Sequence, residues 1–141
     1  MNTKNIGNIG EAKTLAKFIE LGIQVYLPFG DNERADLIAD FGGKLNKIQV
    51  KTSIKAENGV MIFDLTSSTM HRKNGVKHKY TPDEIDFFVC YNIERDSLYL
   101  LEVGEPRSTI KIRFEEPLNG QTYNINREED YLFDNVIAKY I

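Results

Sequence analysis

The sequence ADLIADFGGKLNKIQVKTS, residues 35–53, predicts two β-strands joined by a tight Gly-Gly turn at 42–43. Successive side chains of a strand point to opposite faces, so Gln49 and Lys51 project to the same side of the second strand. A hairpin at this turn brings that pair opposite Asp36 on the first strand. A carboxylate, an amide oxygen and an ammonium group then converge on one spot, where they can hold a divalent metal ion and a phosphate together.

Length and composition predict one ordinary globular domain spanning residues 1–141. A chain of this size buries about two-thirds of its unfolded surface, and its 41% hydrophobic and 28% charged content excludes disordered and fibrous classes. No apolar run approaches the roughly 20 residues that span a bilayer, and the polar start does not read as a signal peptide. We expect no membrane partner and a cytoplasmic location. Cys90, alone within an apolar run, predicts a buried and inert thiol.

The net charge of −3 conceals a basic middle third. Residues 42–82 contain eight Lys and Arg against two acidic residues, a net charge of +6, while the flanking segments 1–41 and 83–141 carry −2 and −7. The local field, rather than the net charge, attracts a phosphate backbone. The basic segment therefore indicates a nucleic-acid partner; the alternative is that these cations lie by chance on a solvated face.

The first half of the chain predicts one helix followed by strands. A helix is expected over residues 9–21, where apolar side chains recur at three- and four-residue steps, at Ile9, Ala12, Leu15, Ala16 and Ile19. Four strands are expected after it, at residues 25–29, 35–41, 44–53 and 60–66. Pro28 places the first strand at an edge or an end of the sheet.

The second half predicts a basic connection, further strands and a closing helix. Residues 67–80 contain no acid and no clear period, and Thr81–Glu84 has the form of a short helix start with a capping box. Residues 87–91 predict a strand buried on both faces, 97–103 and 109–114 outer strands, and 128–140 a last helix. Apolar residues of these outer elements suit either the core or subunit contacts, and we favour the core for Leu98, Tyr99, Leu100, Tyr131 and Phe133. Together these elements indicate an α/β sandwich around a mixed sheet.

The converging residues suit metal-assisted phosphodiester cleavage, which needs oxygen ligands for Mg²⁺ and positive charge near the scissile phosphate. Asp36 is a candidate ligand, Gln49 offers an amide oxygen, and Lys51 can orient the attacking water or offset developing charge. One carboxylate makes a weak Mg²⁺ site, so we expect a second from Glu11, in the first turn of the first helix. Each residue has an ordinary alternative: Glu11 as a helix cap, Asp36 as a strand end, and Lys51 as a surface lysine.

These motifs resemble the PD-(D/E)XK nuclease superfamily. The resemblance rests on Gly10-Glu11, ADLI at 35–38 and IQVKT at 48–52, together with YTPDEIDFF at 80–88. More narrowly, the chain resembles the small intron-encoded homing endonucleases of cyanobacterial type, with archaeal Holliday-junction resolvases as relatives. The resemblance implies a restriction-endonuclease-like core, with a mixed central sheet flanked by helices, and Mg²⁺-dependent cleavage of both DNA strands.

By this resemblance, Asp36 is the central metal-binding acid, Lys51 the catalytic lysine and Glu11 the helix-borne acid of this branch. Gln49 departs from the pattern, because most of the superfamily has Glu or Asp at this position. Losing that charge weakens metal binding unless Glu11 compensates. Ala35 also stands where the motif has proline.

The basic segment at residues 67–80 is the predicted DNA contact. Most of its cations would bind backbone phosphates and a few would reach base edges, the candidates being His71, Arg72, Lys73, Lys77, His78 and Lys79. The alternative is a surface loop without a partner. A metal site on the two histidines lacks a spaced third ligand.

One such site cuts one strand, so cutting a duplex requires two copies related by a two-fold axis. The expected partners are therefore double-stranded DNA and a second copy of the chain, as a dimer or a dimer of dimers, with the tetramer favoured. DNA binding would make the protein nucleoid-associated. The leading hypothesis is a site-specific double-strand DNA endonuclease of the intron-homing type. The alternatives are a Holliday-junction-type, structure-selective resolvase and a non-catalytic DNA-binding module on a nuclease fold.

Overall fold

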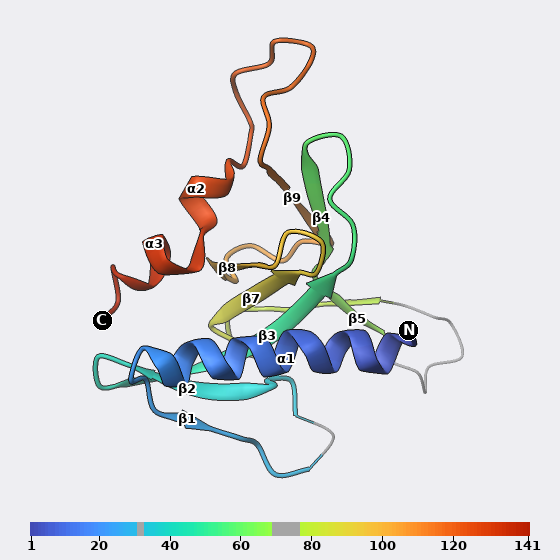
Figure 1. Ribbon diagram of the computed structural model, residues 1–141. Coiled ribbons are helices and arrows are strands. Elements are labelled where there is room, and N and C mark those ends of the chain that lie inside the picture. Colours follow the sequence, from blue (N-terminus) through green and yellow to red (C-terminus); the bar gives the residue numbers. More distant parts are fainter. Residues whose placement is uncertain (31–32, 69–76) are drawn as a thin grey trace.

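The computed structural model describes residues 1–30, 33–68 and 77–141, and Figure 1 shows a long helix lying along one face of a twisted sheet. The central sheet has five strands in the order β1-β2-β3-β7-β8. β3 and β7 run parallel and the other neighbours antiparallel, which confirms the expected mixed sheet. The strands are β1 (Val25–Tyr26), β2 (Leu37–Phe41), β3 (Lys44–Ser53), β7 (Phe87–Asn92) and β8 (Ser97–Glu102).

The hairpin between β2 and β3 forms where the sequence predicts it. Phe41 pairs with Lys44 across the two-residue turn, and the antiparallel register continues to Leu37 opposite Ile48. Both turn glycines have positive φ, +56° and +92°, a conformation that glycine adopts without a steric penalty. β3 has the predicted bounds, whereas β2 begins at Leu37, so that Asp36 lies just before the strand rather than within it.

Helix α1 (Thr3–Glu20) begins six residues earlier than its apolar pattern predicts. Asn2 caps it, since its side-chain oxygen accepts a hydrogen bond from the backbone N–H of Asn5 at 2.9 Å. The residues that α1 buries are Gly10, Thr14 and Phe18, one turn apart, rather than the predicted apolar stripe. Glu11 therefore lies in the middle of the helix, and the alternative that it caps the helix start is wrong.

The missing side chain of Gly10 allows α1 to lie close against β3. A Cβ atom at this position would stand 1.9 Å from Thr52 Oγ1 and 3.4 Å from Val50 Cγ1. Thr14, one turn on, is buried at the same interface and donates its hydroxyl to the Gly10 carbonyl at 2.8 Å. The neighbouring Glu11 is thereby brought to the level of the predicted catalytic strand.

Two hydrophobic clusters sandwich the sheet. The first packs α1 and α3 (Phe133–Ile137) against one face, and the second packs β4 (Val60–Asp64) and β9 (Thr109–Arg113) against the other. β4 and β9 form their own antiparallel sheet, so β4 does not pair with the strands that precede it in the chain. Every residue of β7 is buried, which confirms a strand covered on both faces.

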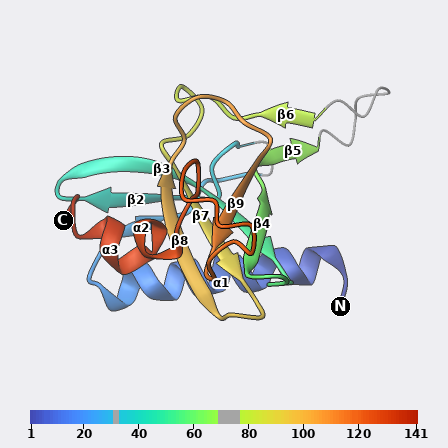
Figure 2. The same ribbon diagram turned by 90° about the horizontal axis from the view of Figure 1, so that it is seen from above.

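The basic segment begins and ends in a short hairpin. β5 (Thr66–Ser68) pairs antiparallel with β6 (Lys77–Lys79), and Figure 2 shows this pair set apart from the central sheet. Residues 81–84 form a hydrogen-bonded turn rather than the start of a helix, with the Glu84 N–H donating to the Thr81 carbonyl at 3.0 Å.

The predicted closing helix is two short helices, α2 (Glu128–Tyr131) and α3, because Leu132 is extended with φ −50° and ψ +131°. Leu132 there makes a β-bridge to Tyr99. Tyr99, Leu100 and Phe133 are buried, which confirms the core rather than a subunit contact for these three. None of the helices within the described ranges is long and apolar enough to cross a membrane.

Candidate active site

Asp36 lies at the point where β2 separates from β3. Its backbone N–H donates to the Ile48 carbonyl at 2.8 Å, and its carboxylate Oδ2 accepts the Val50 N–H at 2.8 Å. The side chain thus takes the place of a main-chain partner for β3 just before β2 begins. Burial raises the pKa of the Asp36 carboxyl group, while the Val50 hydrogen bond and the positive charge of Lys51 limit the rise.

Glu11 reaches Asp36 from helix α1. The two carboxyl groups lie close enough to affect each other's pKa, although they are 25 residues apart in the sequence. Burial raises the pKa of Glu11, and the charge of Asp36 raises it further. Two carboxyl groups this close cannot both ionise without repulsion unless a cation lies between them. The pair that the sequence proposed is therefore brought together.

Lys51 extends from β3 toward both Asp36 and the β5–β6 hairpin. Its Nζ donates to the Thr66 carbonyl at 2.5 Å and lies 5.3 Å from the centroid of the Tyr80 ring. Burial lowers the pKa of the Lys51 ammonium, while the negative charges of Asp64 and Asp36 act in the opposite direction. The group is thus half-buried, close to a carboxylate, and held at the base of the hairpin.

Cys90 lies beside Lys51 in the parallel register of β3 and β7. Its side chain is fully buried, and burial raises the pKa of its thiol to about 12. The expectation of a buried thiol is confirmed, and the raised pKa keeps it protonated and unreactive.

Gln49 occupies the strand position directly before Val50, on the Lys51 face of β3. Its amide nitrogen lies 3.5 Å from the Val50 carbonyl oxygen, the outer limit of a hydrogen bond. Within residues 1–30, 33–68 and 77–141, no three His, Cys, Asp or Glu side chains gather as a metal site would. Glu11 and Asp36 offer carboxylate oxygens as candidate metal ligands here, and the Gln49 amide lies beside them without a charge.

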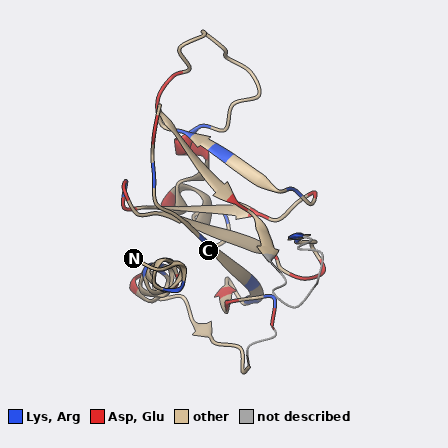
Figure 3. Ribbon diagram, turned by 90° about the vertical axis from the view of Figure 1, so that its right-hand side faces the viewer, with Lys and Arg blue, Asp and Glu red and all other residues tan. Residues whose placement is uncertain are grey.

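The predicted DNA-contacting residues fall into two groups. His71, Arg72 and Lys73 lie outside the described residues. Lys77 and Lys79 are exposed on β6 beside the grey trace in Figure 3, and Lys77 Nζ lies 3.3 Å from Asp64 Oδ2. His78, between these two lysines, instead turns its Nε2 toward the Glu84 carboxylate at 2.7 and 2.8 Å.

No role at the candidate site is assigned to Thr66, Tyr80 or Arg34 from the sequence. Thr66 and Tyr80 border Lys51 from the two sides of the hairpin, and Arg34 lies two residues before Asp36. Thr66 and Tyr80 flank a segment without periodicity, so no spacing links them to Lys51. Arg34 carries one signal, its charge next to the predicted catalytic acid.

Comparison with known proteins identifies a family for this chain. A sequence model of the PD-(D/E)XK endonuclease family matches residues 1–134. Among solved structures, the chain is similar to the bacterial homing endonuclease I-Ssp6803I, with 26% sequence identity and a TM-score of 0.76, over 99% of this chain and 95% of that one. No curated protein sequence matched the chain. The family match spans both carboxylates, the lysine strand and the hairpin, and the chain belongs to the PD-(D/E)XK endonuclease family.

Proposed function

We propose that this protein is a site-specific endonuclease of the homing type, which hydrolyses phosphodiester bonds in double-stranded DNA with Mg²⁺. The observation that carries the proposal is the convergence of Glu11, Asp36 and Lys51 at the point where β2 begins beside β3. The similarity to a bacterial homing endonuclease over nearly the whole of both chains supports the homing type.

The donor set fits a hard divalent cation. Glu11 and Asp36 present carboxylate oxygens whose mutual repulsion a cation relieves, and oxygen is the ligand atom that Mg²⁺ prefers. Gln49 would add an amide oxygen without charge, so the two carboxylates carry the electrostatic part of binding. Bound there, Mg²⁺ supplies Lewis-acid polarisation of the scissile phosphate.

Lys51 supplies the positive charge that the protein itself contributes near the scissile phosphate. Its ammonium lies within electrostatic reach of Asp36, and the Thr66 carbonyl and the Tyr80 ring hold it there. In this position it orients the attacking water or offsets negative charge on the phosphate as the phosphorus–oxygen bond breaks. A fixed donor costs no reorganisation at the moment of reaction.

DNA binding is assigned to the basic segment. Lys77 and Lys79 are exposed on the described part of the hairpin, and His71, Arg72 and Lys73 complete the proposed contact set. His78 has only its second ring nitrogen free of the Glu84 carboxylate, so it is the weakest of the phosphate-binding candidates.

A duplex cut requires two such sites, and we propose a homo-oligomer, with a dimer of dimers favoured. Apolar side chains exposed near the edge strand support this. Tyr26 is 50% exposed, Leu27 70% and Phe29 fully, and Ile19 is 60% exposed near the end of α1, which contacts β1. Soluble monomers seldom leave such residues grouped in water, whereas an interface buries them.

The proposal is tested with wild-type protein, Asp36→Ala and Lys51→Ala, each incubated with Mg²⁺ and a randomised duplex library whose cut ends are sequenced. We expect cleavage at one target in the wild type, and a fall by orders of magnitude in both variants with DNA binding retained. Unchanged cleavage in either variant contradicts the assigned site. Preferential cutting of four-way junctions of arbitrary sequence indicates a resolvase, and salt-sensitive binding without any nicking indicates a non-catalytic module.

A further inference from the structure

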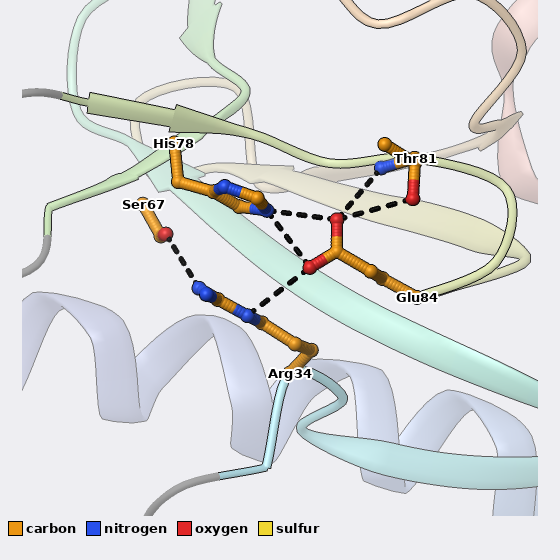
Figure 4. Close-up of polar contacts among 5 residues, drawn as sticks. All are labelled: Arg34, Ser67, His78, Thr81 and Glu84. Atoms are coloured by element: carbon orange, nitrogen blue, oxygen red, sulfur yellow. Dashed lines mark hydrogen bonds and ion pairs between the residues drawn. The ribbon is translucent and has the colours of Figure 1, made fainter.

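The carboxylate of Glu84 joins three segments of the chain at the base of the β5–β6 hairpin (Figure 4). Its Oε1 accepts the Thr81 N–H at 3.1 Å and lies 2.7 Å from His78 Nε2, while its Oε2 lies 3.2 Å from Arg34 Nε. Arg34 also donates from Nη1 to Ser67 Oγ at 3.1 Å. Because Ser67 and His78 face each other in the hairpin, the contacts hold both of its strands. We call Arg34, Ser67, His78, Thr81 and Glu84 the hairpin clamp.

The hairpin clamp lies next to the candidate catalytic residues. Arg34 is two residues before Asp36, in the loop that leads into β2. Lys51 donates to the carbonyl of Thr66, the first residue of β5, and lies over Tyr80, which directly follows β6. The segments that the clamp fixes are therefore the same segments that border Lys51 and precede Asp36.

The β5–β6 hairpin needs such contacts for its stability. A two-stranded sheet with strands of three residues is at best marginally stable in water, and its described strands lie apart from the central sheet. The Glu84 side chain is only 22% exposed, and its contacts are charge-assisted, the stronger class of hydrogen bond. Burial raises the pKa of Glu84, but the hydrogen bonds from His78 and Thr81 outweigh it and hold that pKa below its ordinary value.

We propose that Glu84 is a positioning residue, which fixes the base of the β5–β6 hairpin relative to Asp36 and Lys51. The inference rests on the proposed endonuclease function, because it explains how DNA held by the hairpin presents its scissile phosphate to the catalytic residues. His78 serves this clamp through its contact with Glu84. Nothing in the chemistry requires Glu84 to touch DNA, metal or the reacting atoms.

The first experiment needs neither DNA nor metal. Amide hydrogen exchange is measured by NMR on the wild type, Glu84→Gln and His78→Gln. In both variants we expect exchange of the β5 and β6 amides to accelerate by about tenfold or more, because the hairpin opens locally, while β7 amides stay unchanged. His78→Gln keeps the Arg34 contact with Glu84, so it reports on the clamp even if Glu84→Gln folds poorly.

A matched control is available away from the hairpin. Glu128 is 18% exposed on α2 and likewise serves an arginine and a second residue: its Oε1 lies 2.9 Å from Arg95 Nη2 and accepts the Tyr99 hydroxyl at 2.7 Å. Glu128→Gln therefore removes a comparable ion pair without touching the hairpin clamp. We expect it to leave exchange in β5 and β6 at the wild-type rate.

The second experiment separates positioning from binding. On a duplex selected from the randomised library, single-turnover cleavage by Glu84→Gln should fall about tenfold, a barrier increase of about 1.4 kcal/mol, with the Kd changed less than about threefold. Glu128→Gln should retain the wild-type rate per folded molecule. Adding Arg34→Gln to Glu84→Gln should cost little more than either change alone, since both break the same network.

Each result decides the inference. Wild-type exchange in β5 and β6 of both Glu84→Gln and His78→Gln overturns the clamp, and so does an equal acceleration in Glu128→Gln. Unchanged single-turnover cleavage by Glu84→Gln overturns the positioning role. If the wild type cuts no DNA, the proposed function fails, while the exchange measurement still decides whether Glu84 fixes the hairpin.

Discussion

Glu11 and Asp36 place two interacting carboxyl groups at a partly buried site. Burial is the first cause of the raised pKa of each group. Without a cation this arrangement destabilises the protein at neutral pH, because ionising both groups brings like charges together. Such local cost is typical of residues kept for function rather than for stability.

Replacing Glu11 with Gln should stabilise the cation-free protein. A folded-state pKa above the ordinary 4.5 means that the contribution of Glu11 to stability is full below that pH and is lost as pH rises through the folded pKa. Glu11→Gln avoids this loss, so its advantage grows with pH up to neutrality. Because Glu11 is partly open to solvent, we expect a melting temperature only about 1–3 °C higher at pH 7 in EDTA.

The same melting experiment reports on cation binding. Mg²⁺ should raise the melting temperature of the wild type but much less that of Glu11→Gln, since a ligand stabilises only a state that binds it. Glu57→Gln, which removes an exposed ion pair with Lys55, serves as the control and should show the wild-type response. If Mg²⁺ raised the melting temperature of Glu11→Gln as much as that of the wild type, Glu11 would not be a metal ligand.

These residues also show how much of the candidate site can be predicted from the sequence. The relation of Asp36, Gln49 and Lys51 is predictable because strand alternation and a two-residue turn fix it locally. Glu11 is predicted as the second carboxylate, but its expected place in the first turn of the helix is wrong. The capping-box spacing connects Glu84 with Thr81, but no spacing connects it with Arg34 or His78, since these meet Glu84 only when the hairpin folds back onto the loop before β2.

At the scale of elements, the close approach of α1 to β3 at Gly10 determines whether Glu11 reaches Asp36. Gly10→Ala would place a Cβ atom 1.9 Å from Thr52 Oγ1, and overpacking of this kind costs about 1–3 kcal/mol. The better helix propensity of alanine offsets up to about 1 kcal/mol of this cost. We expect a net loss of about 1–2 kcal/mol in the free energy of unfolding, measured in urea, and slower cleavage as α1 moves outward.

Gly7→Ala is the matched control, one turn earlier on the same helix. Apart from the backbone of α1 itself, no atom of the described residues lies within 4 Å of the place that a Cβ atom would take at Gly7, so the substitution gains helix propensity without a clash. It should raise the free energy of unfolding by about 0.5–1 kcal/mol and leave cleavage unchanged. Similar losses in both variants would mean that the packing of Gly10 on β3 is not what its substitution disturbs.

Three elements escape prediction for physical reasons. The apolar periodicity of α1 misses the face that packs on β3, because close approach there uses Gly10 and Thr14. The closing helix breaks at Leu132 without a glycine or proline, since a bridge to β8 draws the chain into an extended conformation. The sequence predicts β4 as a strand, but its alternating pattern does not indicate that β9 is its partner.

The hairpin cations allow a graded prediction about DNA binding. Each phosphate contact to B-DNA contributes about 0.9 to the slope of log K against log salt. Lys79→Gln should lower that slope by about this amount, whereas Lys77→Gln should lower it less, because Asp64 already pairs with Lys77 at 3.3 Å. Lys139→Gln, near the C-terminus, is the control. Equal slopes in all four proteins would place the DNA contact elsewhere.

At the scale of the whole molecule, one chain supplies one candidate site, so the geometry of an assembly decides where two strands are cut. Stable interfaces bury about 800 Å² per partner around an apolar centre. The apolar group at Ile19, Tyr26, Leu27 and Phe29 offers such a centre beside the edge strand β1. The outer elements cannot supply it through Tyr99, Leu100 or Phe133, which the core already buries.

Replacing Leu27 and Phe29 together with Ser should therefore reduce the order of assembly without unfolding the protein. Both side chains are exposed, so the fold loses little, while an interface that covers them loses its apolar centre. Sedimentation velocity should show the mass halved, and circular dichroism an unchanged fold. Leu118→Ser, at a fully exposed position in the loop between β9 and α2, is the control and should keep the wild-type mass. An unchanged mass in the double variant would exclude the β1 edge as the interface, and loss of cleavage together with loss of mass would tie double-strand cutting to this contact.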